Sequence, residues 1–158
     1  MIFITILAFD QSSTKTGWAQ FEDDNYISSG VINLSHIKND STERLLEMCD
    51  AICKHIEDIR PDLVVIEDIF DKNNVAVLAL LARLQGVIMF RCFKIGIPIK
   101  ILAPKTWRKI VGIKKKDRNG AKEEAVQLVN ELYGLPVTND EAEAVCIAKA
   151  TCENIKKG

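Results

Sequence analysis

The sequence is poor in the residues that bind zinc or form disulfides. It has two histidines, and its five cysteines include no Cys-x-x-Cys pair. Cys49 and Cys53 are one helical turn apart in an apolar stripe, which indicates small buried side chains rather than metal ligands. An odd number of cysteines without a secretory signal is typical of a reducing compartment, and we expect the protein to be cytoplasmic.

Internal repeats, low-complexity tracts and linkers are also absent from the sequence. The chain has 158 residues, of which 47% are hydrophobic, so we expect a single domain over residues 1–158 with a sizeable core. Residues 75–90 are strongly apolar but contain Arg83 and Gln85. This pattern favours a buried or interfacial helix over a membrane span.

The formal net charge of −1 conceals a separation of charge along the chain. Residues 1–82 carry a net charge of −8 and residues 123–158 carry −4, whereas residues 83–122 carry +11 with Asp117 as their one acid. A polyanion senses such a local field rather than the average charge of the protein. We therefore interpret the basic segment as a nucleic-acid-binding surface rather than as a solvated charged face.

Two apolar segments end on acidic residues. Ile4 to Asp10 and Leu63 to Asp68 have strand character without alternation, which is typical of strands covered on both faces. Ligands of open α/β sheets collect at the carboxyl ends of such strands. Carboxylates that meet there repel one another unless a hard divalent cation neutralises them.

The order of the predicted elements indicates the fold class. An antiparallel meander of three strands is followed by helix, strand, helix, strand and then further helices. This order predicts an α/β fold with a five-stranded mixed sheet, three strands antiparallel and two parallel, and helices on both faces. The predicted strands are 4–10, 14–21, 26–34, 63–68 and 97–102, and the predicted helices are 41–59, 73–94, 104–111, 121–133 and 139–155. Ser41 is the predicted N-cap of the first helix.

The predicted helix over residues 73–94 is apolar nearly all round. A helix with so little polar surface needs cover on more than one side. It is either a contact between two copies of the chain or a wholly buried core helix, and the sequence leaves both interpretations open.

Four carboxylates form the candidate metal site. Asp10 and Glu67 end two strands, while Asp140 and Glu143 are three residues apart on one helix and project from one face. Oxygen ligands alone select Mg²⁺ or Mn²⁺ over zinc. Two such ions about 3.5–4 Å apart can activate a water and stabilise the leaving oxygen of a phosphodiester, so we expect two ions per site. Taken alone, each acid is also compatible with an ordinary surface carboxylate or with a negative charge at a helix N-terminus, rather than a metal ligand.

Short motifs follow one another along nearly the whole chain. They are residues 9–13 (FDQSS), 16–19 (TGWA), 65–70 (VIEDIF), 82–87 (ARLQGV), 110–112 (IVG) and 139–148 (NDEAEAVCIA). This ordered set resembles the RuvC family of Holliday-junction resolvases. The resemblance implies a ribonuclease-H-like fold, a homodimer, and Mg²⁺-dependent paired nicking of four-way DNA junctions. It also implies that Asp10, Glu67, Asp140 and Glu143 are the metal ligands and the catalytic residues.

The resemblance further implies a set of DNA-binding residues. Phe70 falls where the family has an aromatic side chain that stacks at the junction, and a core phenylalanine is the alternative. Stacking on an unpaired base is worth roughly 1–3 kcal/mol. Basic residues in the region that contacts DNA in the family would bind phosphates. These residues are Lys105, Arg108, Lys109, Lys114, Lys115, Lys116, Arg118 and Lys122.

The sequence departs from the family pattern at several positions. Residues 11–13 (QSS) replace the more frequent proline-glycine, and Glu143 stands where many members have aspartate. Trp107 occupies a position that is basic in the family, and the loop 114–119 is richer in lysine than usual. These departures predict low sequence selectivity, as in the junction nucleases that phages encode, and an ability to cut other branched DNA.

Three alternatives compete with this interpretation. The first strand also resembles the phosphate-binding opening of actin-like sugar kinases, but their two domains and glycine-rich loops do not fit 158 residues with eight glycines. A ribonuclease-H-like nuclease that processes RNA would share the fold. A non-catalytic junction-binding protein would share the DNA surface. The apolar 73–94 helix and Phe70 favour the junction over RNA, and the intact acid set favours catalysis.

Overall fold

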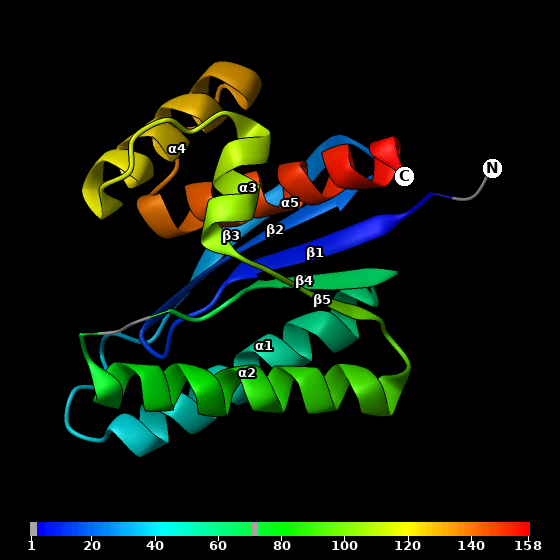
Figure 1. The fold of residues 1–158 in the computed structure, drawn as a ribbon. Coiled ribbons are helices and arrows are strands. Elements are labelled where there is room, and N and C mark those ends of the chain that lie inside the picture. Colours follow the sequence, from blue (N-terminus) through cyan, green and yellow to red (C-terminus); the bar gives the residue numbers. More distant parts are fainter. Residues whose placement is uncertain (1–2, 71–72) are drawn as a thin grey trace.

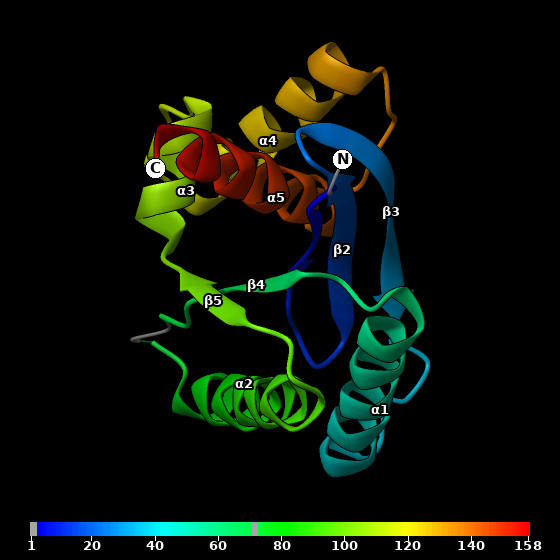
Figure 2. The ribbon, with the colours of Figure 1, turned by 90° about the vertical axis from the view of Figure 1, so that its right-hand side faces the viewer.

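The structure has three layers, with helices on both faces of one five-stranded sheet (Figures 1 and 2). This computed structural model describes residues 3–70 and 73–158. The strand order is β3-β2-β1-β4-β5; the first three strands pair antiparallel, and β4 and β5 continue the sheet in parallel. The strands are β1 (Thr5–Asp10), β2 (Lys15–Glu22), β3 (Asn25–Asn33), β4 (Leu63–Glu67) and β5 (Ile99–Leu102). The helices are α1 (Ser41–Ile59), α2 (Val75–Ile95), α3 (Pro104–Val111), α4 (Arg118–Tyr133) and α5 (Asn139–Lys157). The predicted fold class is confirmed.

The side chains of β1 alternate between two separate cores. Ile6 and Ala8 pack on the face covered by α3, α4 and α5, while Leu7 and Phe9 pack against α1 and α2 (Figure 1). All four are buried. Because the side chains of a strand alternate with a period of two, Asp10 follows Ile6 and Ala8 onto the face of α5.

The neighbouring strand β4 repeats this arrangement. Val64 and Ile66 lie in the core with α1 and α2, and Val65 lies in the core with α5. Glu67 therefore shares the face of Val65. Since β1 and β4 pair in parallel, their two terminal acids end at the same edge of the sheet.

Helix α5 lies close to the sheet because small residues line the contact. Ala142, Ala144 and Ala148 are fully buried. On the strand side, a Cβ atom at Gly17 in β2 would lie 1.9 Å from the backbone oxygen of Asp140, so only glycine fits. This close approach sets the position of the first turns of α5 beside the end of β1.

Several element boundaries differ from the prediction. Asp40 rather than Ser41 caps α1, and its carboxylate accepts from the N–H groups of the second and third helical residues. Aspartate and serine are equally favourable N-caps, so the sequence did not show which of the two neighbouring residues caps the helix. Helix α4 begins at Arg118, earlier than predicted, because Asp117 caps it. Strand β5 begins at Ile99 rather than at residue 97.

Helix α2 is not a wholly buried core helix. Its buried residues are Leu84, Gln85, Ile88 and Cys92. Its exposed apolar side chains are Val75, Val77, Val87, Met89, Phe90 and Phe93. Within residues 3–70 and 73–158, α2 is the one helix whose length and composition would suffice to cross a membrane, and 22% of its apolar 18-residue window is buried. The interpretation as a core helix is therefore wrong, and an apolar face remains open to a partner.

Candidate active site

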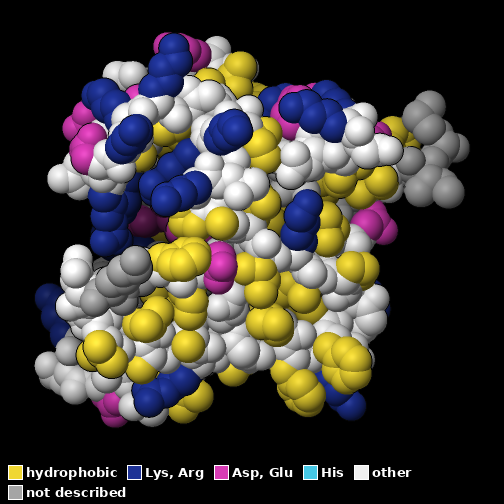
Figure 3. All heavy atoms as spheres, in the orientation of Figure 1, with side chains coloured by type: hydrophobic (Ala, Val, Ile, Leu, Met, Phe, Trp, Pro, Cys, Tyr) yellow, Lys and Arg dark blue, Asp and Glu magenta, His cyan; other side chains and the backbone are white. Residues whose placement is uncertain are grey.

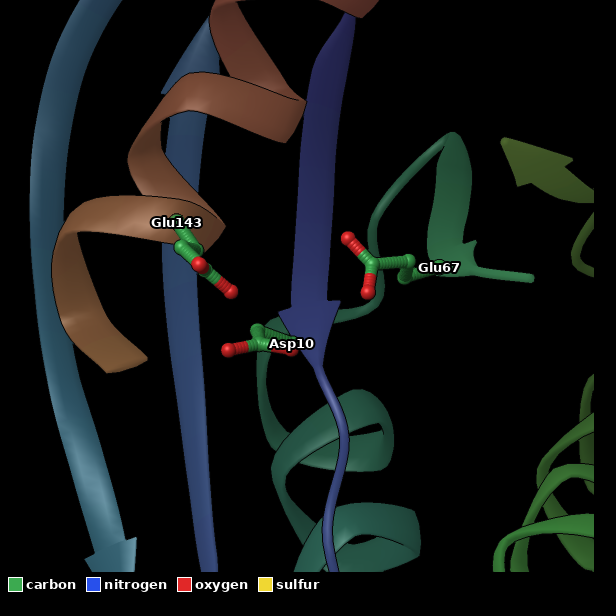
Figure 4. Close-up of side chains that lie close together, drawn as sticks. All are labelled: Asp10, Glu67 and Glu143. Atoms are coloured by element: carbon green, nitrogen blue, oxygen red, sulfur yellow. The ribbon is translucent and has the colours of Figure 1, made fainter. Parts of the chain in front are cut away.

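Carboxylates from three elements meet at the carboxyl end of the parallel strands (Figure 4). Asp10 ends β1, Glu67 ends β4, and Glu143 lies in the second turn of α5. One carboxylate oxygen of each residue lies within 4.8 Å of those of the other two. The structure thus brings together three of the four predicted ligands.

Asp140 lies one helical turn before Glu143 and outside this group of three. It is near enough for its negative charge to help raise the pKa of Asp10. Its role as a fourth ligand stays a prediction. Glu141, between them, accepts a hydrogen bond from Ser29 Oγ on β3 at 3.1 Å, which holds it away from the cluster.

Two polar side chains that were not predicted as site residues hold Glu67. The indole Nε1 of Trp107 donates to Glu67 Oε2 at 2.6 Å. The amide of Gln11 donates from Nε2 to the backbone oxygen of Glu67 at 2.5 Å and accepts at Oε1 from its backbone N–H at 3.1 Å. In the sequence, Gln11 and Trp107 were noted as departures from the family pattern and not as site residues. They are 56 and 40 residues from Glu67, so no local spacing connects them with it.

Burial and mutual repulsion raise the pKa values of the cluster. The pKa of Asp10 lies well above its usual value, first because the group is buried and then because of the charges of Glu143 and Glu67. The pKa of Glu67 is raised to about 7, mainly by burial and then by Glu143, against the hydrogen bond from Trp107 and nearby positive charges. The protein alone therefore opposes full ionisation of the cluster at neutral pH.

This donor set fits a hard divalent cation. All donors are oxygens, which is the preference of Mg²⁺ and Mn²⁺. Glu143 Oε1 is buried and has no hydrogen-bond partner among the residues that the structure describes. A cation held by Asp10, Glu67 and Glu143 would satisfy this oxygen and neutralise the repulsion among the three carboxylates.

Without a divalent cation, we expect the protein to lose stability as the pH rises from about 4.5 to about 7. In this window Glu67 ionises in the unfolded chain before it ionises in the folded one, because its folded pKa is raised from 4.5 to about 7. Below the window it is protonated in both states, and above it the penalty is complete. Mg²⁺ should therefore raise the Tm by on the order of 5 °C near pH 8 and by much less near pH 5.

Thermal unfolding at both pH values, with and without Mg²⁺, measures this effect. The variant Glu67→Gln lacks the titrating group, and its Mg²⁺-dependent shift should be smaller near pH 8. An equal Mg²⁺ effect at the two pH values in the parent protein would contradict the expectation.

Basic residues rim the acidic cluster. The guanidinium of Arg108 lies 5.3 Å from the centre of the Trp107 ring, and its buried Nε has no hydrogen-bond partner in the described part of the chain. Arg108 and Lys122 both lie near enough to lower the pKa of Glu67. Figure 3 shows Lys and Arg side chains gathered over α3 and α4 on this face, around a hollow in which acidic side chains lie.

The other predicted DNA-binding residues lie on the surface. Those that are exposed are Lys105, Lys109, Lys114, Lys115, Lys116 and Arg118. The lysine loop is held by Glu124, whose carboxylate accepts from the backbone N–H groups of Lys114 and Lys115 at 2.9 and 2.8 Å. Phe70 is 69% exposed, so the alternative of a core phenylalanine is wrong.

Known proteins are similar to this chain in both sequence and fold. The profile of the family described as Crossover junction endodeoxyribonuclease RuvC matches residues 6–152. A protein of that name from Ruegeria pomeroyi is 32% identical over 148 residues, which cover 90% of this chain and 87% of that protein. Another from Hydrogenovibrio crunogenus is 29% identical over 154 residues, which cover 94% of this chain and 86% of that protein.

Solved structures agree with these relatives in fold. The structure of Thermus thermophilus RuvC in complex with Holliday junction substrate superposes with a TM-score of 0.78 at 18% identity, over 98% of this chain and 97% of that one. The Fowlpox virus resolvase, in complex with Holliday junction DNA, superposes with a TM-score of 0.69 at 14% identity, over 96% and 99% of the two chains. The fold is thus of the RuvC type, which is ribonuclease-H-like. Because the family profile matches residues 6–152 of the 158, the chain belongs to the RuvC family of crossover junction endodeoxyribonucleases.

Proposed function

We propose that this protein resolves four-way (Holliday) DNA junctions by paired, metal-dependent nicks, and that it also cuts other branched DNA. The observation that carries the proposal is the convergence of Asp10, Glu67 and Glu143 within 4.8 Å in a chain of this family. Two solved structures of similar fold, those of Thermus thermophilus RuvC and the Fowlpox virus resolvase, contain Holliday junction DNA.

The site suits phosphodiester hydrolysis. Two Mg²⁺ ions, with Mn²⁺ as a substitute, would activate a water and stabilise the leaving oxygen when bound there. Asp10, Glu67 and Glu143 supply the ligand oxygens, with Asp140 as the proposed fourth ligand. Arg108 and Lys122, on the neighbouring helices, would contact the phosphates next to the scissile bond and offset the negative charge of the cluster.

The DNA surface extends from this site over the basic loop. Glu124 holds the backbone of Lys114 and Lys115, while the side chains of Lys114, Lys115 and Lys116 are exposed. Phosphate contacts of this kind position the nucleic acid and carry no sequence information. Phe70 lies three residues after Glu67, and its exposed ring is available to stack on a base unpaired at the junction centre.

Replacing Lys114, Lys115 and Lys116 together by alanine should weaken junction binding and flatten its salt dependence. Each lysine that contacts a phosphate contributes about 0.9 to the slope of log Kobs against log salt concentration. The substitution leaves the backbone hydrogen bonds to Glu124 in place, so the loop keeps its conformation. Binding titrations at several salt concentrations give the slope. Lys54→Ala, on α1 on the other face of the sheet, is the control. If the triple variant has the same slope as the parent, the loop is not part of the DNA interface.

We also propose that the active unit is a homodimer formed through α2. The exposed apolar side chains of this helix, which include Phe90 and Phe93, need cover from water. Arg91 forms an ion pair with Glu57, so the charge of Arg91 does not oppose burial of the apolar face. Two subunits would provide two acidic clusters, as paired nicking requires.

Cleavage of a synthetic four-way junction with and without Mg²⁺ tests the proposed function. We expect symmetrical nicks that depend on Mg²⁺ and persist when the core sequence is scrambled. Strict dependence on one core sequence would refute low selectivity, while faster cutting of RNA–DNA hybrids than of junctions would support the RNA-processing alternative. Binding without cleavage in Mg²⁺ would leave a non-catalytic junction-binding protein.

A further inference from the structure

The position of Glu67 in the sheet leaves its backbone without a neighbour on one side. The ladder between β1 and β4 ends at the pair Phe9 and Ile66, one residue before Glu67. On the other side, Glu67 pairs with Leu102 of β5. A strand-end acid in this position would have a backbone N–H and C=O that only water could satisfy on the β1 side.

Gln11 supplies the missing neighbour with its side chain. Its amide both donates to the Glu67 carbonyl and accepts from the Glu67 N–H, and these bonds replace the two that the backbone of a longer β1 would have made. Gln11 is only 6% exposed, so these bonds are shielded from water. The side-chain amide thus extends the sheet by one residue, up to the active site.

Trp107 forms a hydrogen bond with the side-chain carboxylate of Glu67. Its Nε1 donates to Glu67 Oε2 at 2.6 Å, and the whole indole is buried against the core of α5. A buried donor whose ring cannot move fixes the rotation of the carboxylate and occupies one lone pair of Oε2. Glu67 is therefore fixed at both its backbone and its head group, whereas Glu143 Oε1 has no partner among the described residues.

We infer that Trp107 and Gln11 are positioning residues that preset Glu67 as a ligand and thereby set the cation affinity of the site. This inference rests on the proposed metal centre. Groups that orient a ligand from behind typically contribute a factor of about 10–100 to metal affinity. Because the two residues act before DNA binds, their effect should be measurable on the protein and the cation alone.

The experiment is a calorimetric titration that measures the Kd of Mn²⁺ for the DNA-free protein. Trp107→Phe, which removes the donor, and Gln11→Met, which removes the amide at similar volume, should each raise the Mn²⁺ Kd by about 10–100-fold. Replacement of Trp107 by benzothienylalanine keeps the ring shape and changes the N–H to sulfur, so it should reproduce the weakened affinity without a cavity. In cleavage assays, the Mg²⁺ concentration for half-maximal rate should rise, while the rate at saturating Mg²⁺ stays within a few-fold of the parent.

A spectroscopic readout separates positioning from simple destabilisation. In the Trp18→Phe background, Trp107 is the one remaining tryptophan, and its emission should change saturably with Mn²⁺. Adding Asp10→Asn should abolish this change. If the parent binds no Mn²⁺, the proposed metal centre itself fails. If the parent binds Mn²⁺ and the benzothienylalanine and Gln11→Met proteins bind it equally well, the metal centre stands and the positioning role is overturned.

Discussion

Replacing Asp10 by asparagine should lower junction cleavage by at least about a thousandfold and leave junction binding unchanged or tighter. Asp10 lies at the centre of the cluster, where burial and the charges of Glu143 and Glu67 act on it together. Asparagine keeps the volume but lacks the charge that a cation requires. The same change removes negative charge that faces the DNA phosphates, so binding does not suffer. Glu67→Gln should behave in the same way.

Single-turnover cleavage and binding measured on one junction distinguish these effects. Asp68 and Glu141 provide matched controls, because each is an acid next to a proposed ligand. The Asp68 carboxylate accepts from the backbone N–H of Ile69 and that of Glu141 accepts from Ser29, so neither is in the cluster. Asp68→Asn and Glu141→Gln should cleave within a few-fold of the parent. Normal cleavage by Asp10→Asn would show that the ligand assignment is wrong.

The double substitution Phe90→Glu and Phe93→Glu should convert the protein to a monomer. The two rings are 64% and 78% exposed and lie three residues apart on α2, so they share one face. Burying a phenylalanine side chain contributes about 1.5–3 kcal/mol, and a buried unpaired charge opposes association further. The dimer dissociation constant should therefore rise by at least about a thousandfold. Sedimentation equilibrium measures this change directly.

The products of plasmid cleavage also distinguish the dimer from the monomer. On a supercoiled plasmid with an extruded cruciform, paired nicks linearise the DNA, and a single nick leaves an open circle. We expect the monomeric variant to shift the product from linear to open circular. Leu132→Glu, at an exposed apolar position of α4 on the other face of the sheet, should leave both the dimer and the linear product intact. A parent that sediments as a monomer would overturn the proposed interface.

The sheet and the two strand-end acids were predictable because they follow from local patterns. Unbroken apolar runs at 4–10 and 63–68 indicated strands covered on both faces, and acids at their carboxyl ends indicated a ligand site there. The interval of three between Asp140 and Glu143 predicted one helical face, yet the structure places only Glu143 in the cluster. Helical spacing gives the direction of a side chain, whereas the tilt of the helix against the sheet decides which residue reaches the site.

The contacts that hold Glu67 could not be predicted from any spacing. Gln11 follows β1 and Trp107 lies on α3, and they meet Glu67 only because parallel pairing and the packing of α3 bring three separate segments together. The exposure of Phe70 was equally undecided in the sequence, where an aromatic residue after a buried strand is compatible with core and surface. Such contacts depend on the tertiary arrangement, which pattern and propensity do not contain.

The close contact between Gly17 and the backbone of Asp140 makes the acidic cluster part of the packing of the sheet against α5. The strand that contains Gly17 pairs with β1, and the helix that rests on it supplies Glu143. We expect these elements to open together, so cation binding and global folding should be lost in one cooperative step on heating. The hydrogen-bonded amides of β1, of β4 and of α5 between Ala142 and Ala148 should then exchange only through complete unfolding, unlike enzymes in which a mobile lid carries part of the catalytic centre.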